Sequence, residues 1–214
     1  MNRIVNAVLV VLLLAVGWAM AQYNAMSAKP NEAKPAAKVG SMPMPKPAPQ
    51  MTKLINMMWG YWTVSEKADP NPMMPKGGTG QGMARMLPGP GGMSLLETYR
   101  SSGLMNMNFR GSGTLWWDSK AQAYRVVWCD NTLPGGCDAS GTSKWEGDKL
   151  VSTMESEMHG QKTVTRFTYS DWKPDSFVMT MEIGADARSL KPAMTVTYTR
   201  TTPPSTAAVK PAAQ

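Results

Sequence analysis

The chain has 214 residues and a formal net charge of +7, and 17% of its residues are charged. The charge is unevenly distributed, because residues 51–202 contain sixteen Lys and Arg against fourteen Asp and Glu, a net charge of +2. A nearly neutral region of this kind lacks the basic stripe that follows phosphates, which argues against a nucleic-acid partner. The remaining positive charge lies in the flanking segments, where the lysines of residues 22–50 support at most a weak contact with a membrane surface.

Residues 1–21 have the pattern of a secretory signal peptide. A positively charged start at Arg3 precedes an apolar run over residues 4–18, and Ala19-Met20-Ala21 forms a small-x-small cleavage site. An uncleaved membrane anchor is the alternative, but the run is shorter than the ~20 residues that a spanning helix needs. No Cys lies near the cleavage site to support a lipoprotein. We therefore predict a periplasmic or secreted protein.

Residues 22–50 and 203–214 are rich in Pro, Ala and Lys and nearly free of large apolar side chains. Such segments bury too little apolar area to offset the entropy of ordering them. We predict a disordered linker, one folded domain over residues 51–202, and a disordered tail.

The two cysteines, Cys129 and Cys137, fit an oxidising compartment, in which an isolated pair usually forms a disulfide. Closing this short loop would stabilise the fold by roughly 2.5 kcal/mol in the chain-entropy model. It would also hold the turn at Pro134-Gly135-Gly136. A zinc site needs about four ligands, which this pair cannot supply, so we predict no metal site and no cofactor.

Within residues 51–202, a short helical segment over residues 51–58 is followed by β-rich runs separated by Gly, Pro, Asp and Asn. We predict ten strands, at residues 60–67, 95–101, 104–110, 114–118, 123–130, 139–145, 149–157, 163–170, 176–183 and 194–201. Residues 69–93, with repeated Pro and Gly, are predicted to form a long loop. Most other connections have hairpin length, which indicates an antiparallel meander.

The last two predicted strands alternate apolar and polar residues. Phe177, Met179, Met181 and Ile183 share one face of the first, and Met194, Val196 and Tyr198 share one face of the second. Strands with a single apolar face can bury it by closing into a barrel, which also removes exposed edges. We predict an all-β, up-and-down barrel of about ten strands, with a sandwich as the alternative.

Two features resemble the lipocalin, or calycin, signature. Gly60-Tyr61-Trp62 opens the first strand, and Arg200 lies on the same face of the last strand as Tyr198. The resemblance implies that Trp62 closes one end of the barrel, with the Arg200 guanidinium stacked on its ring at a worth of roughly 0.5 to 2 kcal/mol.

A second resemblance covers nearly the whole domain. It rests on Phe109-Arg110-Gly111-Ser112-Gly113-Thr114, then Trp117-Asp118, Tyr124, Trp128, Asp130 and Tyr198-Thr199-Arg200. This series is similar to an uncharacterised family of exported bacterial proteins, the domain of unknown function numbered 1579. The chain departs from the family pattern at Ser112, where His is frequent, and at Trp117, where Tyr is usual. The resemblance implies a lipocalin-like barrel and no particular reaction.

The single histidine, His159, alternates with Glu155 and Glu157, which formally resembles a metal-binding set. The run ends at a predicted hairpin, so we interpret it as a solvated outer face. Haem binding, as in related haem-carrying barrels, requires a His inside the barrel, and His159 falls at a turn.

Methionine is abundant, with twenty residues. Met-rich loops of exported proteins can hold Cu(I) through thioethers, and short clusters occur at Met42-x-Met44, Met73-Met74, Met83-x-x-Met86 and Met105-x-Met107. The alternative is that Met replaces Leu as an adaptable core filler.

No Gly-x-Ser-x-Gly elbow and no second His are present, so we do not expect an enzyme. The leading hypothesis is a barrel that binds a small apolar or amphipathic molecule. Its predicted lining is Tyr124, Trp128, Phe167, Tyr169, Met179, Met181 and Tyr198. The alternatives are a filled barrel that serves as an envelope scaffold or interaction module, and a Cu(I)-binding protein.

Overall fold

The computed structural model describes residues 44–203, apart from residues 72, 73, 105, 106, 134, 138 and 159. The predicted signal peptide, most of the predicted linker and the predicted tail beyond residue 203 lie outside the described residues. Helix α2 spans Pro49–Met58, and η1 is a short 3-10 turn at Pro90–Gly92. Neither has the length and apolar character that a membrane-crossing helix needs, and the described residues hold no other candidate.

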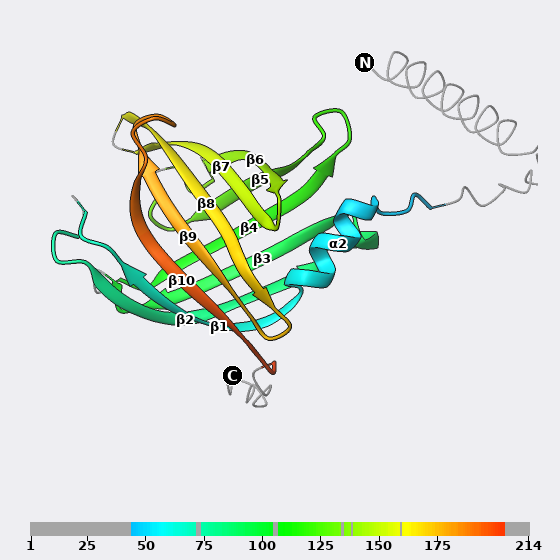
Figure 1. Ribbon diagram of the computed structural model, residues 1–214, viewed down its shortest axis with the longest axis horizontal. Helices are drawn as coiled ribbons and strands as arrows, with labels where there is room; N and C mark the ends of the chain where they lie inside the picture. Colours follow the sequence, from blue (N-terminus) through cyan, green and yellow to red (C-terminus); the bar gives the residue numbers. More distant parts are fainter. Residues whose placement is uncertain are drawn as a thin grey trace, which may run out of the picture. The chain divides into compact units, whose positions relative to one another are not determined.

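Ten antiparallel strands form a closed barrel in the order β1-β10-β9-β8-β7-β6-β5-β4-β3-β2 (Figure 1). Each strand pairs with its neighbours in sequence, and β1 pairs with β10 to close the ring. The prediction of an all-β, up-and-down barrel is therefore confirmed. The strands are β1 (Gly60–Ala68), β2 (Gly78–Pro88), β3 (Ser94–Ser102), β4 (Phe109–Asp118), β5 (Ala123–Asp130), β6 (Ala139–Glu146), β7 (Lys149–Met158), β8 (Gln161–Lys173), β9 (Ser176–Gly184) and β10 (Lys191–Thr201).

The predicted long loop over residues 69–93 is wrong, because most of it is strand β2. Inward and outward residues alternate along β2, and the inward-facing Ala84 and Met86 are buried. The pattern is hidden in the sequence by Gly80 and Gly82, which stand where a side chain would meet the Glu66 carboxylate and the β3 backbone. Glycine is used here for close approach across the sheet, not for flexibility.

The predicted strand over residues 104–110 is also wrong. Strand β4 begins at Phe109 and runs without a break to Asp118, so it unites the end of that segment with the separately predicted strand at residues 114–118. Gly111 and Gly113 therefore lie inside one strand and do not separate two strands. The predicted number of strands is right because one missed strand offsets one that was split.

Helix α2 closes one end of the barrel (Figure 1). Pro49 occupies its first turn, where the missing N–H costs no hydrogen bond. Met51, Leu54 and Met58 recur on one face and are buried in the core. The helix is tied to β1 by Trp62, whose Nε1 donates to the Met58 carbonyl over 2.9 Å.

Arg200 completes this closed end. Its guanidinium carbon lies 4.2 Å from the centre of the Trp62 ring, on the face that the strand parity predicts. The same guanidinium donates to the carbonyl oxygens of Trp59, at 2.7 Å, and Pro174, at 3.0 Å. A Cβ at Gly60 would collide with it, so the glycine of the signature leaves room for the arginine.

Candidate ligand site in the barrel

The interior of the barrel has two halves of different character. In the closed half, near α2, the inward-facing side chains are large and fully buried; they include Trp62, Met86, Leu95, Tyr124, Leu150 and Phe177. In the mouth half, at the opposite ends of the strands, inward-facing side chains remain half-buried; they include Trp128, Thr165, Phe167, Met181 and Ile183. The closed half is therefore filled with side chains, whereas the mouth half keeps accessible apolar surface.

The structure divides the predicted lining residues between these halves. Tyr124 belongs to the closed half, because its hydroxyl donates to the Gln50 carbonyl over 2.9 Å and accepts from Trp145 Nε1 over 3.2 Å. Tyr198 stacks on Phe177, with ring centres 4.3 Å apart. Met179 is buried beside them in the core.

Of the other four predicted residues, Phe167 pairs with Met181 in the mouth half, and Trp128 lies at the mouth end of β5. Tyr169 lies nearer the closed end, because it pairs with Leu150 and its ring centre is 6.3 Å from that of Phe177. Tyr169 is half-buried. Its pKa is raised above the usual value, mainly by burial and to a smaller extent by the charge of Glu97. Both observations fit a ring that is mostly surrounded by protein.

Sequence reasoning missed a polar group at the centre of the interior. We call it the lumen cluster: Glu66 of β1, Glu97 and Tyr99 of β3, Tyr169 of β8 and Tyr198 of β10. Glu66 is 3% exposed and Glu97 is 7% exposed, so both carboxyl groups are buried. The signal was present, because Glu66 shares the parity of Trp62, and Glu97 that of Leu95.

Glu66 is only half satisfied. Its Oε1 accepts a hydrogen bond of 2.6 Å from the Tyr99 hydroxyl, whereas Oε2 has no hydrogen-bond partner among the described residues. Gly80, its neighbour across the β1–β2 ladder, leaves the space that Oε2 occupies, since a Cβ there would collide with it. A buried polar atom without a partner costs free energy, which makes Glu66 a candidate for contact with a bound molecule.

Glu97 has no hydrogen bond or ion pair with any described residue. Burial raises its pKa from 4.5 to about 7. The pKa of Tyr99 is raised by burial and by the Glu66 charge, and that of Tyr198 by burial and by the Glu97 charge. At neutral pH the tyrosines therefore keep their O–H groups, beside two carboxyl groups that no described cation neutralises.

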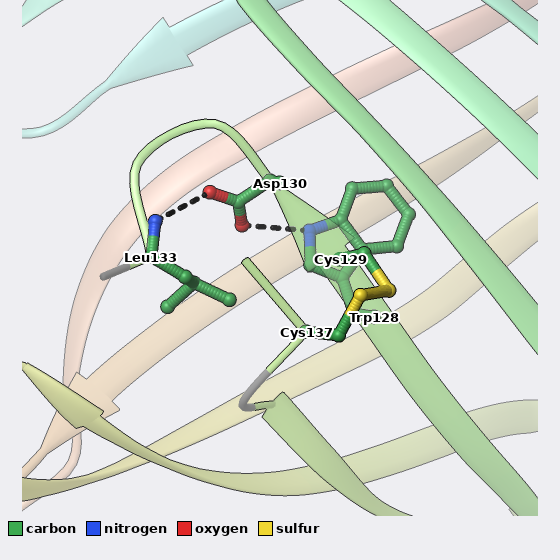
Figure 2. The surroundings of a disulfide bond; sticks show 5 residues. All are labelled: Trp128, Cys129, Asp130, Leu133 and Cys137. Carbon is green, nitrogen blue, oxygen red and sulfur yellow. Dashed lines mark hydrogen bonds between the residues drawn. A yellow bond between two sulfur atoms is a disulfide. The ribbon is translucent and has the colours of Figure 1, made fainter. Parts of the chain in front are cut away.

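The mouth is braced at the end of β5 (Figure 2). Trp128 points inward, and its Nε1 donates to Asp130 Oδ2 over 2.9 Å. Asp130 Oδ1 accepts from the backbone N–H groups of Thr132, at 2.7 Å, and Leu133, at 3.1 Å. This explains the W-x-D series. Trp128 and Asp130 are two residues apart on one strand and so share a face, and the Asp130 carboxylate holds both the indole and the loop that follows β5.

Two glycines of β4 determine how Trp128 lies. A Cβ at Gly113 would be 2.8 Å from the indole ring, and one at Gly111 would be closer still. The ring is therefore laid flat along the barrel wall and does not project across the interior. The G-S-G series of the sequence is explained by this contact.

The disulfide Cys129–Cys137 forms on the outer side of the same strand, as Figure 2 shows. Beside it lies an open depression of about 360 Å³. Its lining residues are Arg110, Gly111, Ser112, Cys129, Asp130, Asn131, Gly136 and Cys137. Because Asp130 is already saturated by the loop, and no buried unpartnered group faces the depression in the described structure, we favour the barrel interior as the site.

The other candidate sites are separated by the fold. Glu155 and Glu157 are exposed on the outer face of β7, and His159 lies outside the described residues. Met83 and Met86 point to opposite sides of β2, and Met83 Sδ accepts from Arg100 over 3.2 Å. Met42, Met73 and Met105 lie outside the described residues, while Met44, Met74 and Met107 lie within them. The described residues contain no group of three or more His, Cys, Asp or Glu side chains placed to hold a metal ion.

Comparison with known proteins agrees with the barrel geometry. The chain is similar to the solved structure of Rv2717c from M. tuberculosis, with a TM-score of 0.52 and 12% identity over 73% of this chain and 99% of that one. It is also similar to the S-type phycobiliprotein lyase CPES from Guillardia theta, with a TM-score of 0.50 and 11% identity over 72% and 93% of the two chains. At these identities the likeness concerns the fold alone.

No curated protein sequence matches the chain. A family model does match, over residues 47–200, and this range begins just before α2 and ends at Arg200. It includes both the closed end and the braced mouth. The chain therefore belongs to the family described as protein of unknown function (DUF1579).

Proposed function

We propose that this barrel binds a small amphipathic molecule in its mouth half. The observation that carries the proposal is the contrast between the two halves of one interior: fully buried side chains near α2, and half-buried Phe167, Met181 and Trp128 toward the mouth. Ligand pockets combine an apolar lining with a few fixed polar groups, and the lumen cluster supplies the polar groups. Binding and carriage, and not catalysis, is the proposed role.

Native mass spectrometry of the full chain, incubated with an extract of its host cells, tests the proposal. We expect a protein ion with an added small-molecule mass that is released on unfolding. Thr165→Phe should abolish the added mass, because Thr165 faces the interior opposite Ile183. Thr168→Phe is the matched control, since Thr168 pairs with Thr180 on the outward face. A wild-type spectrum of protein alone under every condition would overturn ligand binding and favour the filled scaffold.

We propose export as the setting of this function. The support is the predicted signal peptide together with the Cys129–Cys137 disulfide, a bond that persists in oxidising compartments. Expression of the full chain in a bacterial host, followed by sequencing of the N-terminus of the purified protein, provides the test. We expect a mature chain that begins at Gln22. A cytosolic product that keeps residues 1–21 would contradict it.

A further inference from the structure

The interior of the barrel holds two buried carboxyl groups without a matching cation among the described residues. Glu66 and Glu97 both point inward, and neither forms an ion pair among the described residues, in which the ion pairs are Arg125–Asp118 and Arg166–Glu182. Arg200 is the one described basic side chain on an inward strand position, and it is engaged at the closed end by Trp59 and Pro174. A buried carboxylate is stabilised by pairing with a positive charge, and the part of the chain that the structure describes provides none here.

Aromatic rings surround these carboxyl groups. Tyr99 and Tyr198 lie with ring centres 6.4 Å apart, and Tyr99 contacts Phe109 at 5.9 Å. Tyr169 lies near enough for the Glu97 charge to act on it. The negative faces of such rings attract organic cations, more strongly once water is removed.

We infer that the ligand is a small organic cation, an amine with an apolar body, whose ammonium group pairs with Glu66 and Glu97 while its body lies against Phe167 and Met181. This inference rests on the proposed ligand site and specifies its chemistry. In this proposal the ammonium donates to Glu66 Oε2, the buried acceptor without a partner among the described residues, while the Tyr99 hydroxyl donates to the other oxygen of the same carboxyl group. The apolar part follows from the half-buried side chains nearer the mouth.

An inorganic cation is the competing occupant. Calcium takes six to eight oxygen ligands and magnesium demands octahedral geometry. The described lumen cluster offers two carboxyl groups and phenol oxygens, without a third acidic side chain close enough to form a metal-binding group. The rings favour an organic ammonium over either metal.

Isothermal titration of the full chain with matched alkylamines and alcohols, from butyl to decyl, tests the inference at pH 8. Each pair has the same body and differs in the charged head. We expect the amine to bind at least about tenfold more tightly than its alcohol, because the alcohol leaves the carboxylates unpaired. Calcium and magnesium chlorides are titrated as separate arms.

The double variant Glu66→Gln with Glu97→Gln should bring the amine affinity down to that of the alcohol. Glu155→Gln makes the same chemical change on the exposed outer face and should leave the preference unchanged. The wild-type comparison of amine with alcohol stands even if the double variant folds poorly.

The possible failures are distinguishable. Equal binding of amines and alcohols, or tight binding of calcium in preference to amines, would overturn the cation inference and leave the ligand site intact. Absence of binding by both series, with an extract ligand still seen by native mass spectrometry, would also overturn the inference alone. Absence of every ligand in both experiments would overturn the proposed function as well.

Discussion

Trp62→Ala should lower the free energy of unfolding by about 3–5 kcal/mol, the range for removing a large buried aromatic side chain. The indole is 0% exposed and packs edge-on against Phe177, with ring centres 4.8 Å apart. Its removal also leaves the Met58 carbonyl without its donor and Arg200 without a ring beneath it. The loss therefore acts on the helix, the first strand and the last strand together. Urea unfolding followed by circular dichroism measures it.

Trp116→Ala is the matched control, because Trp116 lies on the outward face of β4 and is 38% exposed. Its replacement should cost about 1 kcal/mol or less, as is usual for surface positions. Equal midpoints for the wild type and Trp62→Ala would show that the closed end is not held by this side chain. Such a result would contradict the lipocalin-like reading of the Gly60-x-Trp62 signature.

Glu97→Gln should stabilise the ligand-free protein at pH 8 and change little at pH 4.5. Folding raises the pKa of Glu97 from 4.5 to about 7, so the folded state binds this proton more tightly than the unfolded chain does. The associated stability is fully present below pH 4.5 and is lost as the pH rises through 7. At 1.36 kcal/mol for each pH unit, the gain from the neutral amide is about 3 kcal/mol at most.

The measurement is urea unfolding of wild type and variant at both pH values, since other titrating groups cancel in the difference. Glu155→Gln, on the exposed outer face, should show no pH-dependent difference. A Glu97→Gln effect of equal size at pH 4.5 and pH 8 would mean that the carboxyl group is not kept protonated by burial. The titratable groups that lie near enough for its charge to act on them are Tyr99, Tyr169 and Tyr198.

Local sequence patterns predicted the parts of the fold that follow from alternation. The inward faces of β9 and β10 could be predicted because apolar side chains occur at every second position, as in Phe177 and Met179. Strand β2 could not be predicted in this way, because Gly80 and Gly82 occupy inward positions where apolar side chains would otherwise reveal the alternation. From the sequence alone, a glycine that makes room for a neighbouring strand cannot be distinguished from a glycine that forms a turn.

The lumen cluster escaped prediction for a different reason. The hydrogen bond between Tyr99 and Glu66 joins residues 33 positions apart, on strands separated by β2. Gly80 and Ala84 of β2, which pair with Glu66 and Tyr99, are small enough for the two long side chains to meet across that strand. Parity alone assigns Glu66 to the inward face, but it cannot show that Oε2 is left unpartnered.

Both routes by which the chain enters and leaves the barrel lie at the closed end. Pro47 contacts the turn at Gly92 just before α2, and β10 runs past Arg200 to end at Thr201 beside Tyr61. The domain can therefore be attached to a bead or a sensor surface at either end of the described residues without covering the mouth. Either attachment leaves the mouth, through which we expect a guest molecule to pass, facing solution.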